Sequence, residues 1–439
     1  MEEDKKPVSK ADGQLAEING INYVLPTRLS LVAKRQLREN FAERQTYTNS
    51  AREIQFRLNA SSDFVYGKNS YLTFDISVTA DAGEIGFPAD ITAANLFSRL
   101  LIEDQSGQEL ERVSDFNEWA AVCLPYVWSR DYRTQLQNAG TYDATVAGVG
   151  DIANYDCKAS SLRVVIPMWW LSGVFDTHTF IPPTLLSGML IRLTLETPAR
   201  AFSALSGAPT SISAYTIDNP RIVCDSLMMA PAVQKQVMSK AQGGLGFVYT
   251  TLFRDSYNVG GTSISAQINK AVARALRLDC FTQVATPAAG DLAGVSTRTQ
   301  VASVRQTQCR VGDLYITNQP VRTGTSTATA DVKKNSAEVL NYTYWGLDKT
   351  DTYKDPPING LTDYRSGTTD LNDGKALLCH SLTQHPYVKN AGLSVNNSRV
   401  AEVRIDYSDQ AAAGGKVLKV FMRYIKVATS FPSRAVVKE

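Results

Sequence analysis

The amino-acid sequence predicts an all-β protein in which two strand-rich halves follow one another and helices are few. Three observations lead to this prediction. Short runs with an apolar residue at every second position are frequent, turn residues separate them, and the same texture appears on both sides of a Pro- and Gly-containing stretch near residue 240. The chain has 439 residues, enough for two or three domains with substantial cores.

The alternating runs are typical of half-buried strands in antiparallel sheets. In the first half they lie at 53–59, 70–78, 97–105, 188–196 and 221–229. In the second half they lie at 246–253, 273–281, 312–318, 402–408 and 416–427. Both halves close with a comparable pair of strands, so we expect a tandem duplication of one β fold. Two unlike folds would contradict this hypothesis.

The stretch APAVQKQVMSKAQGG suits a connection between the two halves, because it combines proline, lysines and paired glycines. The predicted organisation is therefore an N-terminal arm at 1–45, a first domain at 46–235, a linker at 236–244, a second domain at 245–430 and a C-terminal tail at 431–439.

The arm is predicted to contain a short basic amphipathic helix. Ser30 is a suitable N-cap, and Ala33, Leu37 and Phe41 recur at four-residue spacing. The arm is expected either to contact a neighbouring subunit, a genome or a membrane, or to pack on its own domain, and both interpretations are open. The candidate contact residues are Lys34, Arg35, Leu37, Arg38, Phe41 and Arg44. Deletion of residues 1–45 is expected to spare the fold and impair assembly.

One further helix is predicted inside the first β domain. Ser114 can cap it and Pro125 is expected to stop it. Between them, apolar residues recur at three- to four-residue spacing, at Phe116, Trp119, Ala120 and Cys123.

Several conspicuous side chains in the strands are interpreted first as structural. Arg192, Arg404 and Arg423 alternate with apolar residues, which indicates solvated faces, or else contacts with a neighbouring subunit. Trp169 and Trp170 are adjacent, so on a strand they would point to opposite faces and could not form one flat sugar-stacking surface.

Composition and motifs give little support for an enzyme. The 45 Lys and Arg residues nearly balance the 43 Asp and Glu residues, so the net charge of +2 indicates neither a polybasic nor an acidic protein. The six cysteines form no CxxC pair, and the three histidines form no HExxH pattern. No catalytic residue, metal ligand or cofactor is predicted. Because no apolar run suits a secretory core or a membrane span, synthesis in a cytosol is expected.

Four segments of the first half carry a resemblance to a known family. They are NSAREIQFRLNASSDFVYGKNSYLTFDISV, NLFSRLLIEDQSGQELERVSDFNEW, IPPTLLSGMLIRLTLE and AYTIDNPRIVCDSLMM. These segments resemble double jelly-roll major capsid proteins of the adenovirus and tectivirus lineage, most of all the polinton-like virus and virophage type. The matching motifs are the YLxFxI strand at 71–76, the SGQELER turn at 106–112 and the helix start at 115–117. The second half matches more loosely, at 263–281 and 418–427.

This resemblance implies two eight-stranded jelly rolls side by side in each chain. It implies a structural protein of the virion, whose homotrimers form pseudo-hexameric capsomers that tile an icosahedral capsid around a DNA genome. The implied partners are other copies of the chain, neighbouring capsomers, minor capsid and penton proteins, and weakly the genome or an internal membrane. Assembly inside the host cell is expected.

Two alternatives stay open at this stage. Jelly rolls also host carbohydrate-binding and glycan-active proteins, and aromatic residues are plentiful in this chain. A minor capsid or vertex protein would share the same fold and setting.

Overall fold

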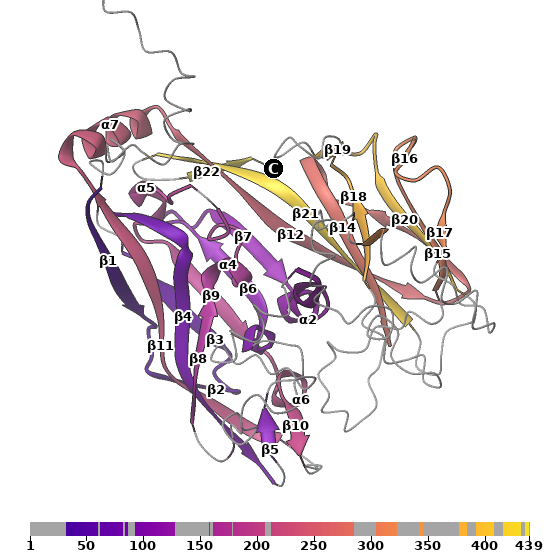
Figure 1. Ribbon diagram of the computed structural model, residues 1–439, viewed down its shortest axis with the longest axis horizontal. Helices are drawn as coiled ribbons and strands as arrows, with labels where there is room; N and C mark the ends of the chain where they lie inside the picture. The colour runs from indigo at the N-terminus through magenta and orange to yellow at the C-terminus, as the bar shows by residue number, and fades with distance from the viewer. Residues whose placement is uncertain are drawn as a thin grey trace, which may run out of the picture.

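The computed structural model describes residues 32–59, 62–81, 84–86, 93–127, 158, 161–177, 179–206, 212–284, 304–322, 342–343, 345, 377–383, 392–407, 416–431 and 435–438. Residues 1–31 of the predicted arm, and His178 and His385, lie outside these ranges. Within them the chain forms two β domains that stand side by side, each with two large sheets (Figure 1). None of the described helices is long and apolar enough to cross a membrane.

The first domain packs two four-stranded antiparallel sheets against each other. One has the order β1 (Val32–Phe41), β11 (Ile212–Met229), β4 (Phe64–Ala80) and β8 (Leu162–Pro167). The other has the order β3 (Glu53–Arg57), β9 (Leu190–Leu195), β6 (Phe97–Glu103) and β7 (Glu109–Ser114). Short additional strands are β2 (Thr46–Thr48), which pairs with β11, and the pair β5 (Glu84–Gly86) and β10 (Ser203–Ser206).

The second domain repeats this arrangement. One sheet has the order β12 (Leu245–Val259), β21 (Lys416–Ser430), β14 (Val272–Val284) and β18 (Leu378–Ser381). The other has the order β13 (Ser263–Ile268), β20 (Ala401–Tyr407), β15 (Val304–Val311) and β16 (Leu314–Tyr315). Short additions are β17 (Val321–Arg322), β19 (Leu393–Val395) and β22 (Ala435–Lys438).

The two domains have the same topology. When the eight main strands of either domain are counted in chain order, one sheet reads 1-8-3-6 and the other reads 2-7-4-5. This is the strand order of a jelly roll. The prediction of an all-β fold with two tandem eight-stranded jelly rolls is therefore confirmed, and the two halves are not unlike folds.

The predicted helix in the arm is wrong, because the segment forms the strand β1. From Lys34 to Phe41 this strand pairs in continuous antiparallel register with β11, so the first roll begins at Val32 and not at residue 46. The reason lies in the spacing on which the prediction rested. Residues four apart lie on the same face of a strand as well as of a helix. The pattern at Ala33, Leu37 and Phe41 therefore fits both, and hydrogen bonding to β11 decides in favour of the strand.

The short helices lie between the strands. They are η2 (Ala93–Leu96), α2 (Phe116–Val127), α4 (Met168–Leu171), α5 (Pro183–Leu186), α6 (Pro198–Ala201) and α7 (Pro231–Gln242). The predicted helix in the first domain is α2, which extends two residues past Pro125. The stretch between the two rolls forms α7, which overlaps the predicted linker, and the chain leaves it through Gly244 at φ +93°. A residue without a Cβ suits that left-handed conformation.

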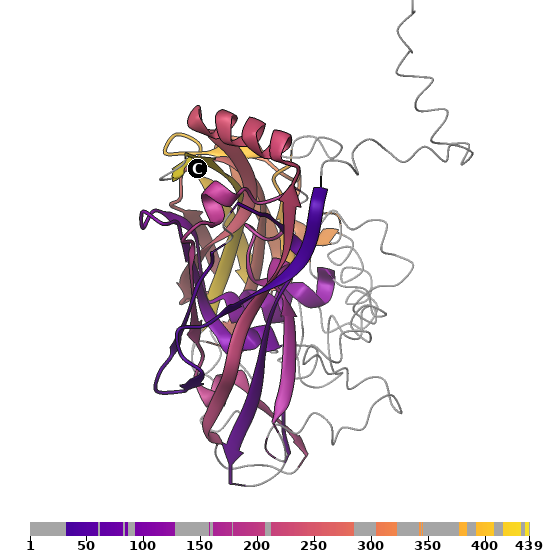
Figure 2. The same ribbon diagram turned by 90° about the vertical axis from the view of Figure 1, so that its left-hand side faces the viewer.

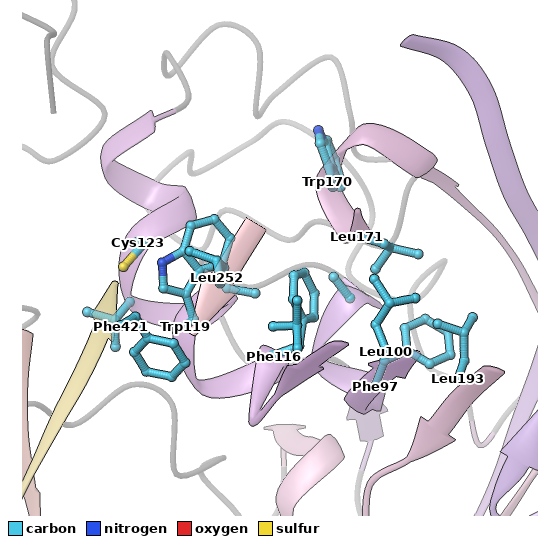
Figure 3. Close-up of a cluster of buried hydrophobic side chains, with 14 of the residues drawn as sticks. Phe97, Leu100, Phe116, Trp119, Cys123, Trp170, Leu171, Leu193, Leu252 and Phe421 are labelled. Atoms are coloured by element: carbon cyan, nitrogen blue, oxygen red, sulfur yellow. The ribbon is translucent and has the colours of Figure 1, made fainter. Parts of the chain in front are cut away.

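A single cluster of buried apolar side chains extends through both rolls. Some strands contribute to it by strict alternation, as in β9, where Ile191, Leu193 and Leu195 face inward. Figure 3 shows the part of this cluster around α2, where Trp119 lies beside Leu252 of β12 and Phe421 of β21. The helix α2 therefore joins the core of the first roll to that of the second.

Candidate assembly surfaces

The edge strand β1 presents apolar side chains to solvent. Leu37 is 62% exposed and Phe41 is 61% exposed, more than any other large apolar residue that the structure describes. Both lie on the same face of the strand as Arg35, whereas Lys34 and Arg38 lie on the opposite face. Since β1 is the last strand of its sheet, its outer edge is open to a further chain within the described residues.

The six predicted contact residues are only partly brought together. Arg44 lies beyond the strand, in the turn before β2, and its backbone N–H donates to the Tyr47 hydroxyl at 3.1 Å. Arg38 is half-buried and Lys34 is exposed at the start of the strand. The shared face therefore consists of Arg35, Leu37 and Phe41.

Arg35 anchors β1 to the rest of its sheet. Its Nε and Nη2 atoms donate to the two carboxylate oxygens of Asp225 at 2.8 and 2.7 Å. Asn69 Nδ2 donates to the same carboxylate at 2.9 Å. Burial acts to raise the pKa of Asp225, but the hydrogen bonds from Arg35 and Asn69 outweigh it and lower that pKa below its ordinary value. The arginine is thus committed to the fold, whereas Leu37 and Phe41 are open to a partner.

Because β1 belongs to the first roll, two truncations are expected to behave differently. A chain without residues 1–30 keeps every described strand and should unfold at the same temperature as the full chain. A chain without residues 1–45 loses β1 and leaves the edge of β11 unpaired, so it should unfold at a lower temperature and aggregate. Circular dichroism melting curves of the two chains test this. Equal stability would contradict the place of β1 in the sheet.

The junction between the rolls is built around a buried carboxylate. Asp279 of β14 is fully buried and accepts a hydrogen bond from Trp119 Nε1 of α2 at 3.0 Å. Arg277 Nε donates to the same oxygen at 3.2 Å and lies 3.1 Å from the other oxygen, to which Cys379 Sγ donates at 3.2 Å. Buried charges are stable only when they are paired and hydrogen-bonded. Arg277 and Cys379 belong to the second roll, and Trp119 of the first roll completes the cluster.

Further polar contacts join the same two surfaces. Each links a residue of the first roll with one of β12, β21 or β22. They are Tyr249 with the Leu110 carbonyl, Lys419 with Glu118, Arg254 with Asp115, Arg423 with Asp176, and the Ala435 N–H with Asp104. Contacts spread over the whole junction hold the rolls in one relative position.

The two rolls approach each other closely at Gly173. A Cβ atom at this position would lie 1.5 Å from the backbone oxygen of Thr250 in β12. Beside it, the buried Glu111 accepts hydrogen bonds from Ser172 Oγ and from the Gly173 N–H at 3.0 Å. The adjoining cavity has a volume of about 70 Å³, far below the roughly 300 Å³ at which small-molecule pockets begin. The junction is therefore built for contact between rolls.

Glu111 is expected to make the stability of the junction depend on pH. Burial raises the pKa of this carboxyl, although hydrogen bonds from Ser172, Gly173 and Thr251 oppose the shift. Its contribution to stability is greatest below the ordinary glutamate pKa and declines as the pH rises through the raised value. Relative to the wild type, Glu111→Gln should therefore gain stability between pH 4 and pH 8. Urea unfolding of both chains across this range tests this, and a constant difference would contradict it.

The sequence predicted the helix that holds Trp119, but it did not predict that Trp119 contacts Asp279 of the second roll. The missed residues of the junction are Asp279, Gly173 and Glu111. One signal was present, because Arg277 and Asp279 interrupt the apolar run ARALRLDCF. Arginine and aspartate are almost never fully buried unless they are paired, so these two residues were candidates for an ion pair, exposed or buried.

No protein-family model and no curated protein matches this chain. Solved structures do. The Faustovirus major capsid protein aligns over 96% of this chain and 94% of its own, with a TM-score of 0.61 and 9% identity. A chain of the Sputnik virophage aligns over 99% of this chain and 93% of its own, with a TM-score of 0.59 and 12% identity. A chain of the PBCV-1 virus capsid aligns over 92% of this chain and 97% of its own, with a TM-score of 0.57 and 11% identity.

The chain has a double jelly-roll fold. The likeness to the three viral structures extends over both rolls, because it covers nearly the whole of each chain. At 9–12% identity the likeness concerns the fold. Within this fold, Trp169 and Trp170 follow β8 in α4 and lie edge to face, with ring centroids 5.9 Å apart. They do not form a flat sugar-stacking platform.

Proposed function

We propose that this double jelly-roll chain is the structural subunit of a viral capsid. The observation that carries the proposal is the likeness of both rolls to the Faustovirus major capsid protein and to a chain of the PBCV-1 virus capsid, over more than 90% of every chain compared. A tile of a shell must keep its shape under load. The paired charges and continuous core of the junction provide that rigidity, because separating the rolls would expose the Asp279 cluster.

The proposed assembly is a homotrimer that forms a pseudo-hexameric capsomer. Three copies of a chain with two equivalent rolls place six similar wedges around a threefold axis. Such capsomers would tile an icosahedral capsid around a DNA genome, next to minor capsid and penton proteins. In this proposal the protein has no catalytic role, is made inside the host cell and ends in the virion.

We place one contact between subunits at the exposed face of β1. An open edge strand with two exposed apolar side chains is a liability for a protein that stays monomeric. Leu37 and Phe41 carry this liability on the first roll. Contact with a neighbouring copy would remove both side chains from water.

The native mass of the purified chain tests the proposal. Light scattering should give three times the chain mass of 48.0 kDa, and negative-stain images should show hexagonal outlines. A stable monomer at micromolar concentration would contradict the capsomer. The abundance of the chain in purified particles separates a main shell protein from a minor capsid or vertex protein, because only the main shell protein dominates.

The contact at β1 is tested by the double variant Leu37→Gln and Phe41→Gln. Withdrawing two such side chains from water contributes about 3 kcal/mol to each contact, which is about 100-fold in affinity, so the trimer should dissociate at concentrations at least about 100-fold higher. Both residues are exposed in the single chain, so the melting curve of the dissociated variant should match that of the wild-type chain. Leu314→Gln, an exposed site on the second roll, is the control. If the trimer dissociates at the same concentration as the wild type, the face of β1 is not a contact between subunits.

A further inference from the structure

A polar cavity lies on the second roll, over the strands β20, β15 and β16. Figure 1 shows these strands at the end of the molecule away from β1. Figure 2, seen from the side of the first roll, shows that roll in front of the second. The cavity is therefore separate from the junction and from the exposed face of β1. Its lining residues are Gln308, Cys309, Arg310, Tyr315, Glu402 and Arg404.

The register of the sheet brings the lining side chains together. Arg310 lies opposite Glu402 of β20 on one side and opposite Tyr315 of β16 on the other, so these side chains form one row across three strands. Gln308 lies opposite Arg404 in the next row. Residues two apart on a strand share a face, so both rows face outward from the core. The two rows form one polar patch.

Carboxylates hold both arginines of this patch in place. Arg310 Nε and Nη2 donate to Glu402 Oε2 at 2.9 and 2.5 Å, and Ser265 Oγ donates to the other oxygen. Burial acts to raise the pKa of Glu402, but the hydrogen bonds from Ser265 and Arg310 outweigh it and lower that pKa below its ordinary value. Arg404 Nε donates to Asp406 Oδ1 at 3.3 Å. The two carboxylates therefore fix the guanidiniums and balance their charge.

The size of the cavity suits one unit of a longer ligand. Its volume of about 190 Å³ is room for about six water molecules. Pockets for whole drug-sized molecules are larger, from roughly 300 Å³ upward. A single sugar ring at the end of a glycan is a unit of the right size.

The chemistry of the lining favours a neutral sugar over an ion. A guanidinium has five N–H groups, and those not used in the ion pairs can donate to hydroxyl groups. Gln308 Nε2 donates to the Thr317 carbonyl at 3.3 Å, so its amide oxygen is the atom that can accept from a hydroxyl. The ring of Tyr315 is 49% exposed and offers a flat apolar surface to the C–H groups of a sugar.

We propose that this cavity binds a neutral hexose unit of a glycan. The hexose hydroxyls accept from Arg404 and donate to Gln308, and its ring carbons lie on Tyr315. An anion would have to displace Glu402 or Asp406 from their arginines, and a cation would meet two guanidiniums. The site is built within one roll, so the inference goes beyond the capsid role and does not depend on the capsomer.

Saturation-transfer NMR of the full chain tests the proposal. The probes are the methyl glycosides of glucose, galactose and mannose. At least one of them should bind with a dissociation constant of roughly 1–10 mM, which is the affinity expected of a ligand with so few atoms. An excess of acetate or sulfate should not displace it, because the arginines already have carboxylate partners.

Two variants assign the binding to this cavity. Arg404→Gln removes a charged donor and should weaken glycoside binding about tenfold or more. Tyr315→Ala removes the ring and should weaken it severalfold, whereas Tyr315→Phe keeps the ring and should retain most of the binding. The matched control is Arg163→Gln on the first roll, which should bind as the wild type does. Arg163 is 62% exposed and pairs with Asp75, as Arg404, 63% exposed, pairs with Asp406.

Three results would overturn the proposal. They are no binding of any of the three glycosides, displacement of the bound glycoside by acetate or sulfate, and binding by Arg404→Gln and Tyr315→Ala that equals binding by the wild type. Because Arg404 and Tyr315 are exposed, both variants should melt at the wild-type temperature. A loss of glycoside binding is thereby distinguished from a loss of the fold.

Discussion

Gly173→Ala is expected to destabilise the protein by about 3 kcal/mol or more. The added methyl group would lie 1.5 Å from the Thr250 oxygen and 2.7 Å from its carbonyl carbon, and these are backbone atoms of a paired strand. Overpacking of a well-filled site typically costs about 1–3 kcal/mol, and a clash with backbone that cannot turn aside lies at the upper end of that range. Relief requires the two rolls to separate, which exposes the junction.

The control for this substitution is Gly246→Ala. Gly246 lies on the same strand as Thr250, and a Cβ atom there meets nothing within 4 Å. The change in stability should stay within about 0.5 kcal/mol. Urea unfolding of both variants beside the wild type measures the two effects. If Gly173→Ala unfolds at the wild-type midpoint, the rolls do not approach each other at this point.

Asp279→Ala should cost about 3–5 kcal/mol, because it leaves the buried Arg277 guanidinium without its counter-ion. It also removes the acceptor of Trp119 Nε1. Asp279→Asn keeps one acceptor oxygen for Trp119 Nε1, loses the charge and puts an NH2 donor in place of the second acceptor, so its cost should lie between those of alanine and the wild type. Urea unfolding of the wild type, Asp279→Ala and Asp279→Asn gives the free energy of unfolding of each protein and so tests this order.

The chain provides a matched control for this substitution on another strand. Arg404 and Asp406 of β20 form the same arginine-x-aspartate pair, with an Nε to Oδ1 distance of 3.3 Å, but Arg404 is largely exposed. Exposed pairs contribute about 0–1 kcal/mol, so Asp406→Ala should have a small effect. If Asp279→Ala and Asp406→Ala lower the free energy of unfolding equally, the first roll does not bury the pair formed by Arg277 and Asp279.

Much of the fold could be predicted from local patterns. The runs at 53–59 and 188–196 became β3 and β9, because alternation records which side of a strand faces the core. The run at 312–318 kept only two residues as a strand, because Gly312 makes a turn at φ +60° before Leu314. The prediction of a helix in the arm was wrong for a different reason. Its four-residue spacing is common to strand and helix, and the strand that completes it comes about 190 residues later.

The junction was less accessible to such reasoning. In sequence, Arg277 and Asp279 look like Arg404 and Asp406, yet the first pair is buried and the second is not. Arg423 was interpreted as part of a solvated face, and it is a half-buried partner of Asp176 in the other roll. Burial at a junction is decided by the neighbouring domain, and local periodicity contains no information about that domain.

The shared core also affects the order of events during synthesis. The first roll has all its strands once Met229 has been made, but Trp119 lacks its acceptor Asp279 and its neighbour Phe421 until β14 and β21 join it. The strand β21 lies between β12 and β14 and ends at Ser430, near the end of the chain. At a synthesis rate of roughly 5–20 residues per second, the face of α2 that packs on the second roll stays exposed to solvent for roughly 10–40 seconds on the ribosome. During this time the exposed apolar face can aggregate with other chains. A nascent chain of this kind reaches release unaggregated only if a chaperone covers that face or if aggregation is slow.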